Sequence, residues 1–575
     1  MTTVRGDLQT IRFGAFELDP SCGELRKQGV KVRLQEQPFR ILQMLLENPG
    51  RLVSREELRQ ALWPGNSYVD FDQGLNRAIN KLREALDDSA ENPRFIETTA
   101  KRGYRFISDL SQPSREIRSL LVLPLENLSQ DPEQEYFADG LTEALITCLA
   151  KISALRVVSR TTAMVYKGVR RPLPEIAREL NVEGIVEGTV MRAEGRARIS
   201  AQLVHAPSDT HLWAEIYDRD LRDVMALQME VATAIVREVQ VKLTPHEQLQ
   251  LANPRPVEPE VYETYLKGRY HWNKRTLAGM SKGAEYFQQA IDKDSRYAAA
   301  YAGLADSAAR LGWWGYVTPE EGCARAIAVA RKGLVIDDTL AEAHAALCFG
   351  LLHHDYAFQS AEEEGRRAVA LDPKSAFAAQ ALGCCLITTA RFEEGINEAI
   401  RAAQLEPLSP ILKWTVGSFY YHARQYDRAL AYCGKCFELV PDFPAARIAM
   451  AWILMKTSST DEGITELEAA VRETGDNYNF LGTLGYCYAV RRRPEEARKI
   501  LSRLEETAKQ RYIPTLWPAV IHGSLGDMDE AFRLLETAHR EHVPWIAYIK
   551  VVPFCDALRT DPRFDALLQR MNFPA

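Results

Sequence analysis

A period of 34 residues runs through the C-terminal half of this 575-residue chain. Pro373, Pro407 and Pro441 recur at that interval, each two residues after a leucine. One slot of the period holds only small residues, namely Ala361, Gly395, Ala429, Gly463, Ala497 and Ala531. Another slot, seven residues later, holds Ala368, Ala402, Cys436, Ala470, Leu504 and Ala538. Small side chains let helices cross closely, so the period predicts helix pairs that stack along the chain.

The same period resembles the tetratricopeptide repeat, whose unit is two helices in 34 residues. The stretch "LGYCY" at 484–488 matches the L-G-x-x-Y element of that repeat, and "ALG" at 381–383 matches part of it. Six units lie in register from about 342 to 545, and looser units lie upstream with an insertion near 313–322. The resemblance implies an all-α superhelix over residues 260–575, with a concave face that binds a protein or peptide.

Residues 117–250 alternate short apolar strands with helices. "SLLVLPL" (119–125) and "ALRVVS" (154–159) read as strands, and residues 139–152 between them have a helical period. This order predicts two parallel strands joined by a crossover helix. Residues 183–219 read as a meander of strands with turns at "AEGR" and "PSDT". The region resembles the α/β domain of TolB-like regions and of some adenylate-cyclase-associated proteins, and we expect a connector or sensor.

Residues 1–110 show a third pattern, in which short predicted strands precede predicted helices. Residues 11–34 read as strands, and a helix follows from Pro38 to about Glu47. The residues of this helix that we expect to point inward are Phe39, Leu42, Leu45 and Leu46. Ser54, with Glu57 three residues later, forms the capping-box pair of a second helix.

A third helix is predicted from residue 75 to 88. Four apolar residues share one of its faces at i, i+4, i+7 and i+11, namely Leu75, Ile79, Leu82 and Leu86. The residues off that face are polar, and include Asn76, Arg77, Asn80, Lys81 and Arg83. The hairpin "TTAKRGYRFIS" (98–108) follows, with Lys101 and Arg102 at its tip. We expect Gly103 to let the tip turn and Tyr104 and Phe106 to anchor the hairpin on the core.

This ordered set resembles the OmpR/PhoB-type winged helix-turn-helix domain, most closely the version in CadC-like regulators. The resemblance covers about residues 10–108 and rests on "VSREELRQALWP", "LNRAINKLREAL" and "ETTAKRGYRF" in that order. In that family the third helix enters the major groove, and the hairpin, or wing, contacts the minor groove or the backbone. The resemblance implies DNA contacts by Arg77, Asn80, Lys81, Arg83, Lys101 and Arg102. Ala100 stands where many relatives carry an Arg, so we expect a different wing contact.

The distribution of charge agrees with a polyanion partner at this end of the chain. Residues 1–108 hold 17 Lys and Arg against 15 Asp and Glu, a charge of +2, whereas the whole chain carries -7. The remaining residues therefore carry -9. Arg and Lys can donate to guanine, Asn can pair with adenine, and phosphate contacts supply salt-dependent affinity. We predict a DNA-binding transcriptional regulator, with RNA polymerase and a second copy on DNA as further partners. The alternative is a scaffold whose winged helix binds protein.

The sequence contains no signal peptide and no window of about 18 uninterrupted apolar residues, so we expect a cytoplasmic protein with no membrane partner. We expect no phosphate-accepting receiver domain before the winged helix and no membrane helix after it. The signal is therefore expected to enter through the repeats or through a partner.

No catalytic motif is recognisable. P-loop, dinucleotide-binding, G-x-S-x-G and H-E-x-x-H patterns are missing, so we predict neither an enzyme nor a cofactor. On the 34-residue period, Cys433 corresponds to Gly365 and Ala399, and Cys436 to Ala368 and Ala402. Small packing residues are expected there, which favours packing over metal binding. Asp139 and Glu143 lie near a predicted helix start, where carboxylates favour capping. The predicted fold is multidomain: an α+β winged helix, an α/β domain and an all-α repeat superhelix.

Overall fold

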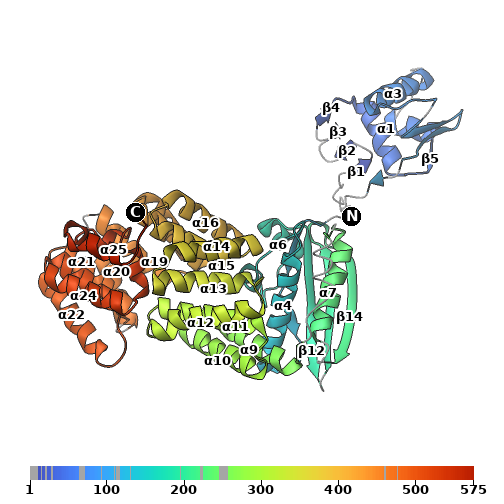
Figure 1. The fold of residues 1–575 in the computed structure, drawn as a ribbon. Helices are drawn as coiled ribbons and strands as arrows, with labels where there is room; N and C mark the ends of the chain where they lie inside the picture. Colours follow the sequence, from blue (N-terminus) through green and yellow to red (C-terminus); the bar gives the residue numbers. More distant parts are fainter. Residues whose placement is uncertain are drawn as a thin grey trace. The chain divides into compact units, whose positions relative to one another are not determined.

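The computed structural model describes residues 11–13, 16–19, 23–27, 30–63, 71–91, 93–108, 110–111, 117–129, 131–193, 196–220, 224–241, 243–244, 257–458, 461–474 and 477–574. Most of the two polar, Pro-containing stretches that the sequence predicts as linkers, 109–116 and 252–260, lies outside these ranges. Residues 64–70 and part of the predicted turn at 193–196 also lie outside them. The chain divides into two compact units, Met1–Ile117 and Arg118–Ala575 (Figure 1). The predicted α/β region and the repeats therefore belong to one unit, and a boundary between them near residue 250 stays a prediction.

Two small sheets frame the first unit. An antiparallel sheet in the order β4-β3-β2-β1-β8 confirms the strands predicted over residues 11–34. Its strands are β1 (Ile11–Phe13), β2 (Phe16–Asp19), β3 (Glu24–Lys27), β4 (Val30–Val32) and β8 (Leu110–Ser111). The second sheet has the order β5-β7-β6, with β5 (Leu52–Ser54), β6 (Ile96–Thr99) and β7 (Gly103–Phe106). Strands β6 and β7 form the predicted wing.

Three helices fill the space between these sheets: α1 (Glu36–Leu46), α2 (Arg55–Leu62) and α3 (Phe71–Leu86). The predicted apolar face of α3 is confirmed, since its four residues are at most 1% exposed. The helix begins at Phe71, four residues before the predicted start. In α1, Leu42, Leu45 and Leu46 are buried and Phe39 is half-buried against the same core, as predicted. Ile41, which was not predicted, is fully buried as well.

A mixed sheet opens the second unit. Its main order is β11-β9-β12-β13-β14, with β9 (Ser119–Val122), β11 (Arg156–Val157), β12 (Gly184–Ala193), β13 (Arg196–His205) and β14 (Thr210–Asp220). Strands β9 and β11 are parallel and are joined through α4 (Glu135–Ala150), which confirms the predicted crossover. Strands β12, β13 and β14 form the predicted antiparallel meander.

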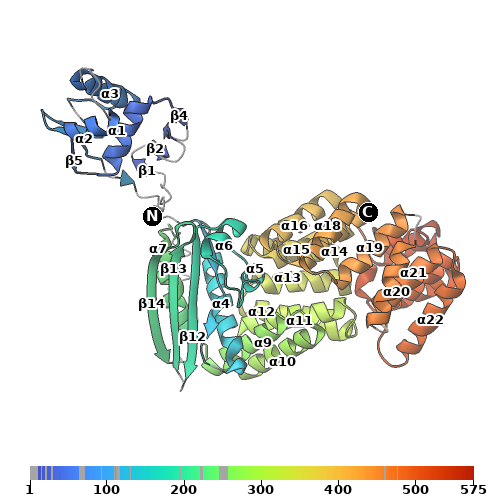
Figure 2. The ribbon, with the colours of Figure 1, turned by 180° about the vertical axis from the view of Figure 1, so that it is seen from behind.

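Helix α4 lies between this sheet and the first helices of the repeats (Figures 1 and 2). Gly140 of α4 permits the close approach of α9 (Pro259–Trp272), because a Cβ there would lie 2.8 Å from a methyl carbon of Leu266. The expectation that Asp139 and Glu143 cap this helix was wrong, since α4 begins at Glu135. Asp139 instead pairs with Lys167 at 2.6 Å, and Glu143 bonds residues of α9 and its neighbours.

The repeats form an array of paired helices, which confirms the 34-residue period. After α9 the array comprises α10 (Leu277–Lys293), α11 (Ala298–Trp313), α12 (Arg325–Ile336), α13 (Ala341–Gly350), α14 (Phe358–Leu371), α15 (Ala376–Thr388), α16 (Phe392–Leu405), α17 (Pro410–His422), α18 (Tyr426–Leu439), α19 (Pro444–Thr457), α20 (Glu462–Thr474), α21 (Tyr478–Val490), α22 (Pro494–Ala508), α23 (Leu516–Leu525) and α24 (Met528–Arg540). Both slots for small residues are buried throughout, Cys436 included. Cys433 is buried as well, and both thiol residues have 0% exposure. Burial raises the pKa of both thiols to about 12.

A second regularity of the array lies in the backbone. Among the described residues, five turns between the helices of a pair contain a left-handed residue on the 34-residue period, at spacings of 34 or 68: Tyr356, Ala390, Arg424, Arg492 and Gly526. Glycine is the residue that best tolerates this conformation, yet it occupies only one of the five positions. Stacking of the helix pairs therefore holds these turns in a conformation that the residues themselves do not favour.

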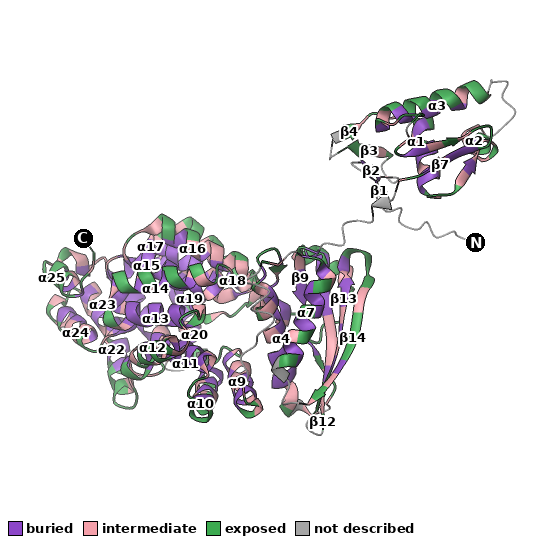
Figure 3. Cartoon of the chain, turned by 45° about the vertical axis from the view of Figure 1, so that its right-hand side comes forward, coloured by how far each residue is buried: buried purple, intermediate pink, exposed green. Residues whose placement is uncertain are grey.

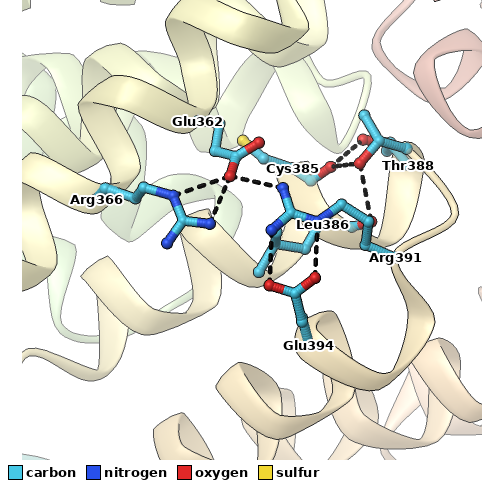
Figure 4. A network of polar contacts seen from close by, with 8 residues as sticks. Glu362, Arg366, Cys385, Leu386, Thr388, Arg391 and Glu394 are labelled. Atoms are coloured by element: carbon cyan, nitrogen blue, oxygen red, sulfur yellow. Dashed lines mark hydrogen bonds and ion pairs between the residues drawn. The ribbon is translucent and has the colours of Figure 1, made fainter. Parts of the chain in front are cut away.

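Ion pairs join neighbouring pairs of helices at the rim of the array. Glu362 of α14 accepts hydrogen bonds from Arg366 of the same helix at 2.6 Å and from Arg391 at 2.7 Å, and Arg391 is bidentate to Glu394 of α16 (Figure 4). Burial tends to raise the pKa of Glu362, but the two arginines hold it below its ordinary value. These bonds link α14 to the start of α16 in the next helix pair.

The C-terminal segment, residues 543–560, turns back against the inner helices of the array. The ring of Trp545 stacks on Trp313 of α11 with centroids 5.1 Å apart and lies 6.1 Å from Trp452 of α19. The hydroxyl of Tyr548 lies 3.0 Å from Nε2 of His353. Part of the concave face that the sequence suggested for a partner is thus covered by the chain itself.

Candidate nucleic-acid interface

The tip of the wing has a strained backbone and exposed charges. Arg102 donates its backbone N–H to Thr99 at 3.0 Å, which closes a turn with Lys101 in the left-handed region at φ 60°. Gly103 is required by space, because a Cβ there would lie 2.1 Å from the carbonyl oxygen of Val53 in β5. Tyr104 and Phe106 are buried, as predicted for the anchors of the hairpin. The fold thus holds the wing rigidly and leaves both cations at its tip exposed.

Helix α3 has one buried and one exposed side (Figure 3). Arg77, Asn80 and Lys81 are exposed, at the relative positions i, i+3 and i+4. Residues at this spacing share one side of a helix. The Nζ of Lys81 donates to Oε1 of Gln35 at 2.7 Å, a contact that a stronger acceptor such as a phosphate can replace. Five of the six predicted contact residues therefore lie on the surface.

Arg83 is the exception, and the expectation that it points outward was wrong. Only 7% of this residue is exposed. Its Nη2 donates to the carbonyl oxygen of Ile96 at 2.9 Å and to Oγ1 of Thr98 at 2.8 Å, both in β6. Position 83 follows Leu82 and Ile79 around the helix, so it adjoins the buried face. The guanidinium ties α3 to the wing, and we remove it from the set of expected DNA contacts.

A residue that the sequence did not single out, Arg55, positions α3 against the wing. Its Nη2 donates to Asp72 at 2.6 Å and its Nη1 to the hydroxyl of Tyr104 at 3.1 Å. The same hydroxyl donates to Oδ1 of Asn76 at 3.2 Å. Asn76 is therefore engaged within the fold, next to the exposed Arg77. In the sequence, the one hint of this positioning role was that Arg55 directly follows Ser54, the N-cap residue of α2.

The start of α2 is also fixed by hydrogen bonds. The predicted capping box is confirmed: Oγ of Ser54 accepts from the backbone of Glu57 at 3.2 Å, and Oε2 of Glu57 accepts from the backbone of Ser54 at 2.7 Å. The backbone N–H and the hydroxyl of Ser54 both donate to Oε2 of Glu57, each at 2.7 Å, and these two bonds lower the pKa of Glu57. The backbone N–H of Arg55 donates to the carbonyl oxygen of Arg102 at the wing tip, at 3.1 Å. The wing, α2 and α3 are therefore one rigid frame for the exposed cations.

Comparison with known proteins identifies both ends of the chain. Residues 29–106 match the family described as "Transcriptional regulatory protein, C terminal", and residues 448–511 match the tetratricopeptide repeat. The putative adenylate cyclase 3 of Rhizobium meliloti is 36% identical over 235 residues, 40% of each chain. Transcriptional regulator HilA of Salmonella typhi is 23% identical over 452 residues, 77% of this chain and 73% of the relative. The cholera toxin homolog transcriptional activator of Vibrio parahaemolyticus is 36% identical over 102 residues, 17% of this chain and 35% of the relative.

The fold and the surface define a winged helix-turn-helix domain joined to a sheet-containing region and a helical repeat array. The winged domain belongs to the OmpR/PhoB type, and the array is built of tetratricopeptide repeats. The chain spans only 40% of the length of the cyclase relative and 35% of that of the Vibrio activator. Over the ranges that the structure describes, every helix is too short or too polar to cross a membrane.

Proposed function

We propose that this chain is a transcriptional regulator that binds double-stranded DNA through α3 and the wing. The observation that carries the proposal is the rigid frame of Arg55, Asn76 and Tyr104, which sets the exposed side of α3 beside the wing. The proposed contact residues are Arg77, Asn80, Lys81, Lys101 and Arg102.

The chemistry of these five residues suits DNA. An exposed Arg and an Asn one turn apart can donate to guanine and pair with adenine when the helix lies in the major groove. Lys101 and Arg102 lie at the tip of the wing, and position 100 holds Ala where many relatives have an Arg. This difference favours phosphate contacts by the two cations over insertion of a side chain into the minor groove. The relatives named transcriptional regulator and transcriptional activator support this assignment.

The second unit is the proposed receiver of the signal. We propose that the repeats bind a protein or peptide, that the sheet region connects or senses, and that RNA polymerase and a second copy are further partners on DNA. The proposal places the protein in the cytoplasm and gives it no enzymatic activity. A cyclase name belongs to a relative of which the chain spans 40%. Formation of cyclic AMP from ATP by the purified full chain would contradict the proposal of no enzymatic activity.

Selection of DNA fragments by the full chain, followed by salt titration, tests DNA binding. About four to six phosphate contacts predict that log affinity falls with log salt at a slope of about -4 to -5. Arg77→Ala with Lys81→Ala should lower the affinity for a selected fragment, and Lys31→Ala should not, since Lys31 is paired with Glu24 at 2.6 Å. A flat salt dependence would contradict DNA binding and would favour a scaffold whose winged helix binds protein.

Control of DNA binding by the repeats needs a separate measurement. The affinity of the full chain for a selected fragment should differ from that of the compact unit 1–117. Equal affinity of the two, with and without a ligand of the repeats, would contradict control by the second unit while leaving DNA binding intact.

A further inference from the structure

The inner side of the array encloses a cavity. It has a volume of about 330 Å³ and lies among α11, α15, α17, α19 and α21. A larger cavity of about 620 Å³, between the array and the sheet region, shares six lining residues with it: Thr161, Arg275, Arg310, Ala376, Phe377 and Glu406. Both volumes fall in the range of small-ligand sites.

The cavity is bounded along the array. Tyr478 of α21 donates its hydroxyl to the carbonyl oxygen of Trp314, just after α11, at 2.9 Å. This bond joins the start of α21 to the residue that follows α11, two positions that are 164 residues apart in the sequence. Beyond it, Trp545 of the C-terminal segment stacks on Trp313. A long extended peptide would need a continuous groove, so the bounded shape favours a compact ligand.

One cation faces this space without a carboxylate partner. Arg275 lines both cavities from the turn after α9, where its backbone is left-handed at φ 56°. Its guanidinium carbon lies 3.6 Å from the ring centroid of Trp272, a contact that fixes its direction. Among the described residues, no carboxylate lies within 4 Å of it. The side chain is accessible from the cavity yet surrounded by protein, and this burial, together with the nearby Arg310, lowers the pKa of Arg275 to about 10.

The carboxylates near Arg275 are already engaged. Asp306 accepts from Nε of Arg310 at 3.1 Å, and Glu406 accepts from Oγ1 of Thr161 at 3.0 Å. Arg310 also donates to Oε1 of Gln380 at 3.3 Å. Arg275 is exposed to this space and forms an ion pair with none of the described carboxylates, so an anionic ligand would gain a charge-assisted hydrogen bond there.

The rest of the lining is largely apolar. Aromatic and aliphatic side chains surround the cavity, among them Met280, Phe377, Ile411, Phe443, Ile448 and Phe480. Amide and hydroxyl groups of Gln380, Ser409, Asn477 and Asn479 add a few polar points. Arg275, Arg310 and Glu406 are the charged residues of the lining, and Arg310 is paired with Asp306. The available cation beside an apolar wall suits a ligand with one anionic end and an apolar body.

We propose that this cavity binds a compact organic carboxylate, with the carboxylate on Arg275 and an apolar body, of the size of a phenyl or indole group, against Phe377 and Ile411. The proposal rests on the proposed function, because it names the ligand class of the receiving unit. The same chemistry occurs in a free aromatic acid and in the last residue of a protein that ends in an aromatic side chain. The experiment therefore includes both sources.

The test is calorimetry on the full chain with two pairs of probes: 3-phenylpropionate with its amide, and a tetrapeptide ending in Phe as the free acid and as the amide. At least one acid should bind about tenfold or more tightly than its amide, because only the acid can pair with the cation. The acid that binds identifies the source. If no acid binds, or if each amide binds as well as its acid, the proposal is wrong.

Variants locate the site. Arg275→Met should remove the preference for the acid, whereas Lys274→Met removes the neighbouring charge outside both cavities and should leave it unchanged. Ile411→Trp keeps Arg275 but fills the cavity, and should abolish binding of the acid. Unchanged binding by Arg275→Met or by Ile411→Trp would overturn the proposal. DNA affinity, measured on the same samples, reports on the winged domain, so a failure of DNA binding is distinguishable from a failure of this site.

Discussion

Exposed arginines of the first unit and a buried arginine of the second unit act in opposite ways. In the first unit, Arg77 on α3 and Arg102 on the wing are exposed and are the proposed contacts to DNA. In the second unit, Arg310 on α11 is 8% exposed, and its partners are Asp306 one turn away and Gln380 on α15. An exposed cation acts through long-range attraction that salt screens, whereas a buried one acts through fixed geometry. The comparison therefore distinguishes exposed cations, which are available for recognition, from a buried cation, which holds neighbouring helices in one arrangement.

The largest expected effect concerns the exposed cations. Arg77→Ala with Lys81→Ala should reduce affinity for a selected site by on the order of 100-fold, since a base contact is worth about 1–3 kcal/mol. Lys101→Ala with Arg102→Ala should weaken binding to all sequences and make the salt slope shallower by about 2. Competitive binding measurements over several salt concentrations check both. Equal loss of sequence preference in the two double variants would contradict the assignment of base contacts to α3 and of phosphate contacts to the wing.

Two arginines on the same helix should differ in their effect on stability. Arg83→Met leaves the carbonyl of Ile96 and the hydroxyl of Thr98 without their partner, which should lower the free energy of unfolding by about 1–3 kcal/mol. Arg77→Met, at an exposed position, should change it by less than about 0.5 kcal/mol. Urea unfolding of the full chain, followed in the transition of the winged domain, provides the comparison. Similar values for both variants would show that Arg83 does not tie α3 to the wing.

The buried interior should be sensitive to acid, unlike the exposed surface. His353 faces the carbonyl of Phe349 and the hydroxyl of Tyr548, with Arg310 nearby, and burial lowers its pKa to about 3. An unfolded chain takes up a proton near the ordinary pKa of about 6.5. The stability that neutral His353 contributes is therefore present above pH 6.5 and is lost as the pH falls toward 3. From pH 7 to pH 5 the loss is about 2 kcal/mol.

Thermal unfolding of the second unit at both pH values checks this. His353→Gln cannot titrate, so its unfolding temperature should fall less between pH 7 and pH 5 than that of the wild type. His522→Gln is a control, because His522 is partly exposed and hydrogen-bonds Asp527 at 2.9 Å. The same acid sensitivity in wild type and His353→Gln would assign it to other groups.

The smallest effect is expected at the strained tip of the wing. Lys101→Gly relieves a left-handed backbone that costs a residue with a side chain roughly 1–2 kcal/mol, and the added entropy of the unfolded chain offsets part of that gain. Lys101→Ala removes the same charge but keeps the strain. The Gly variant should therefore be up to about 1 kcal/mol more stable than the Ala variant, and both should lose the same DNA affinity. A higher free energy of unfolding for Lys101→Ala than for Lys101→Gly would contradict the proposal that the backbone at the wing tip is strained.

Local pattern predicted much of the fold. The four-residue apolar face of α3, the capping box at Ser54 and the 34-residue slots all depend on spacing along a single helix, and each was confirmed. Arg83 could not be assigned in this way, because its environment is set by β6 and not by its own helix. Arg55 was missed for the same reason: its partners, Asp72 and Tyr104, lie 17 and 49 residues away.

The sequence by itself determined that the chain has a winged helix at one end and repeats at the other, because short-range periodicity specifies which faces of the elements are buried. Only the tertiary structure decided which cations remain free. Contacts between distant residues removed Arg83 from the surface and folded residues 543–560 against the inner helices. They also left Arg275 beside a cavity with no described carboxylate in ion-pair contact with it. Burial and pairing of a charge depend on what three-dimensional packing brings beside it, and no local pattern contains that information.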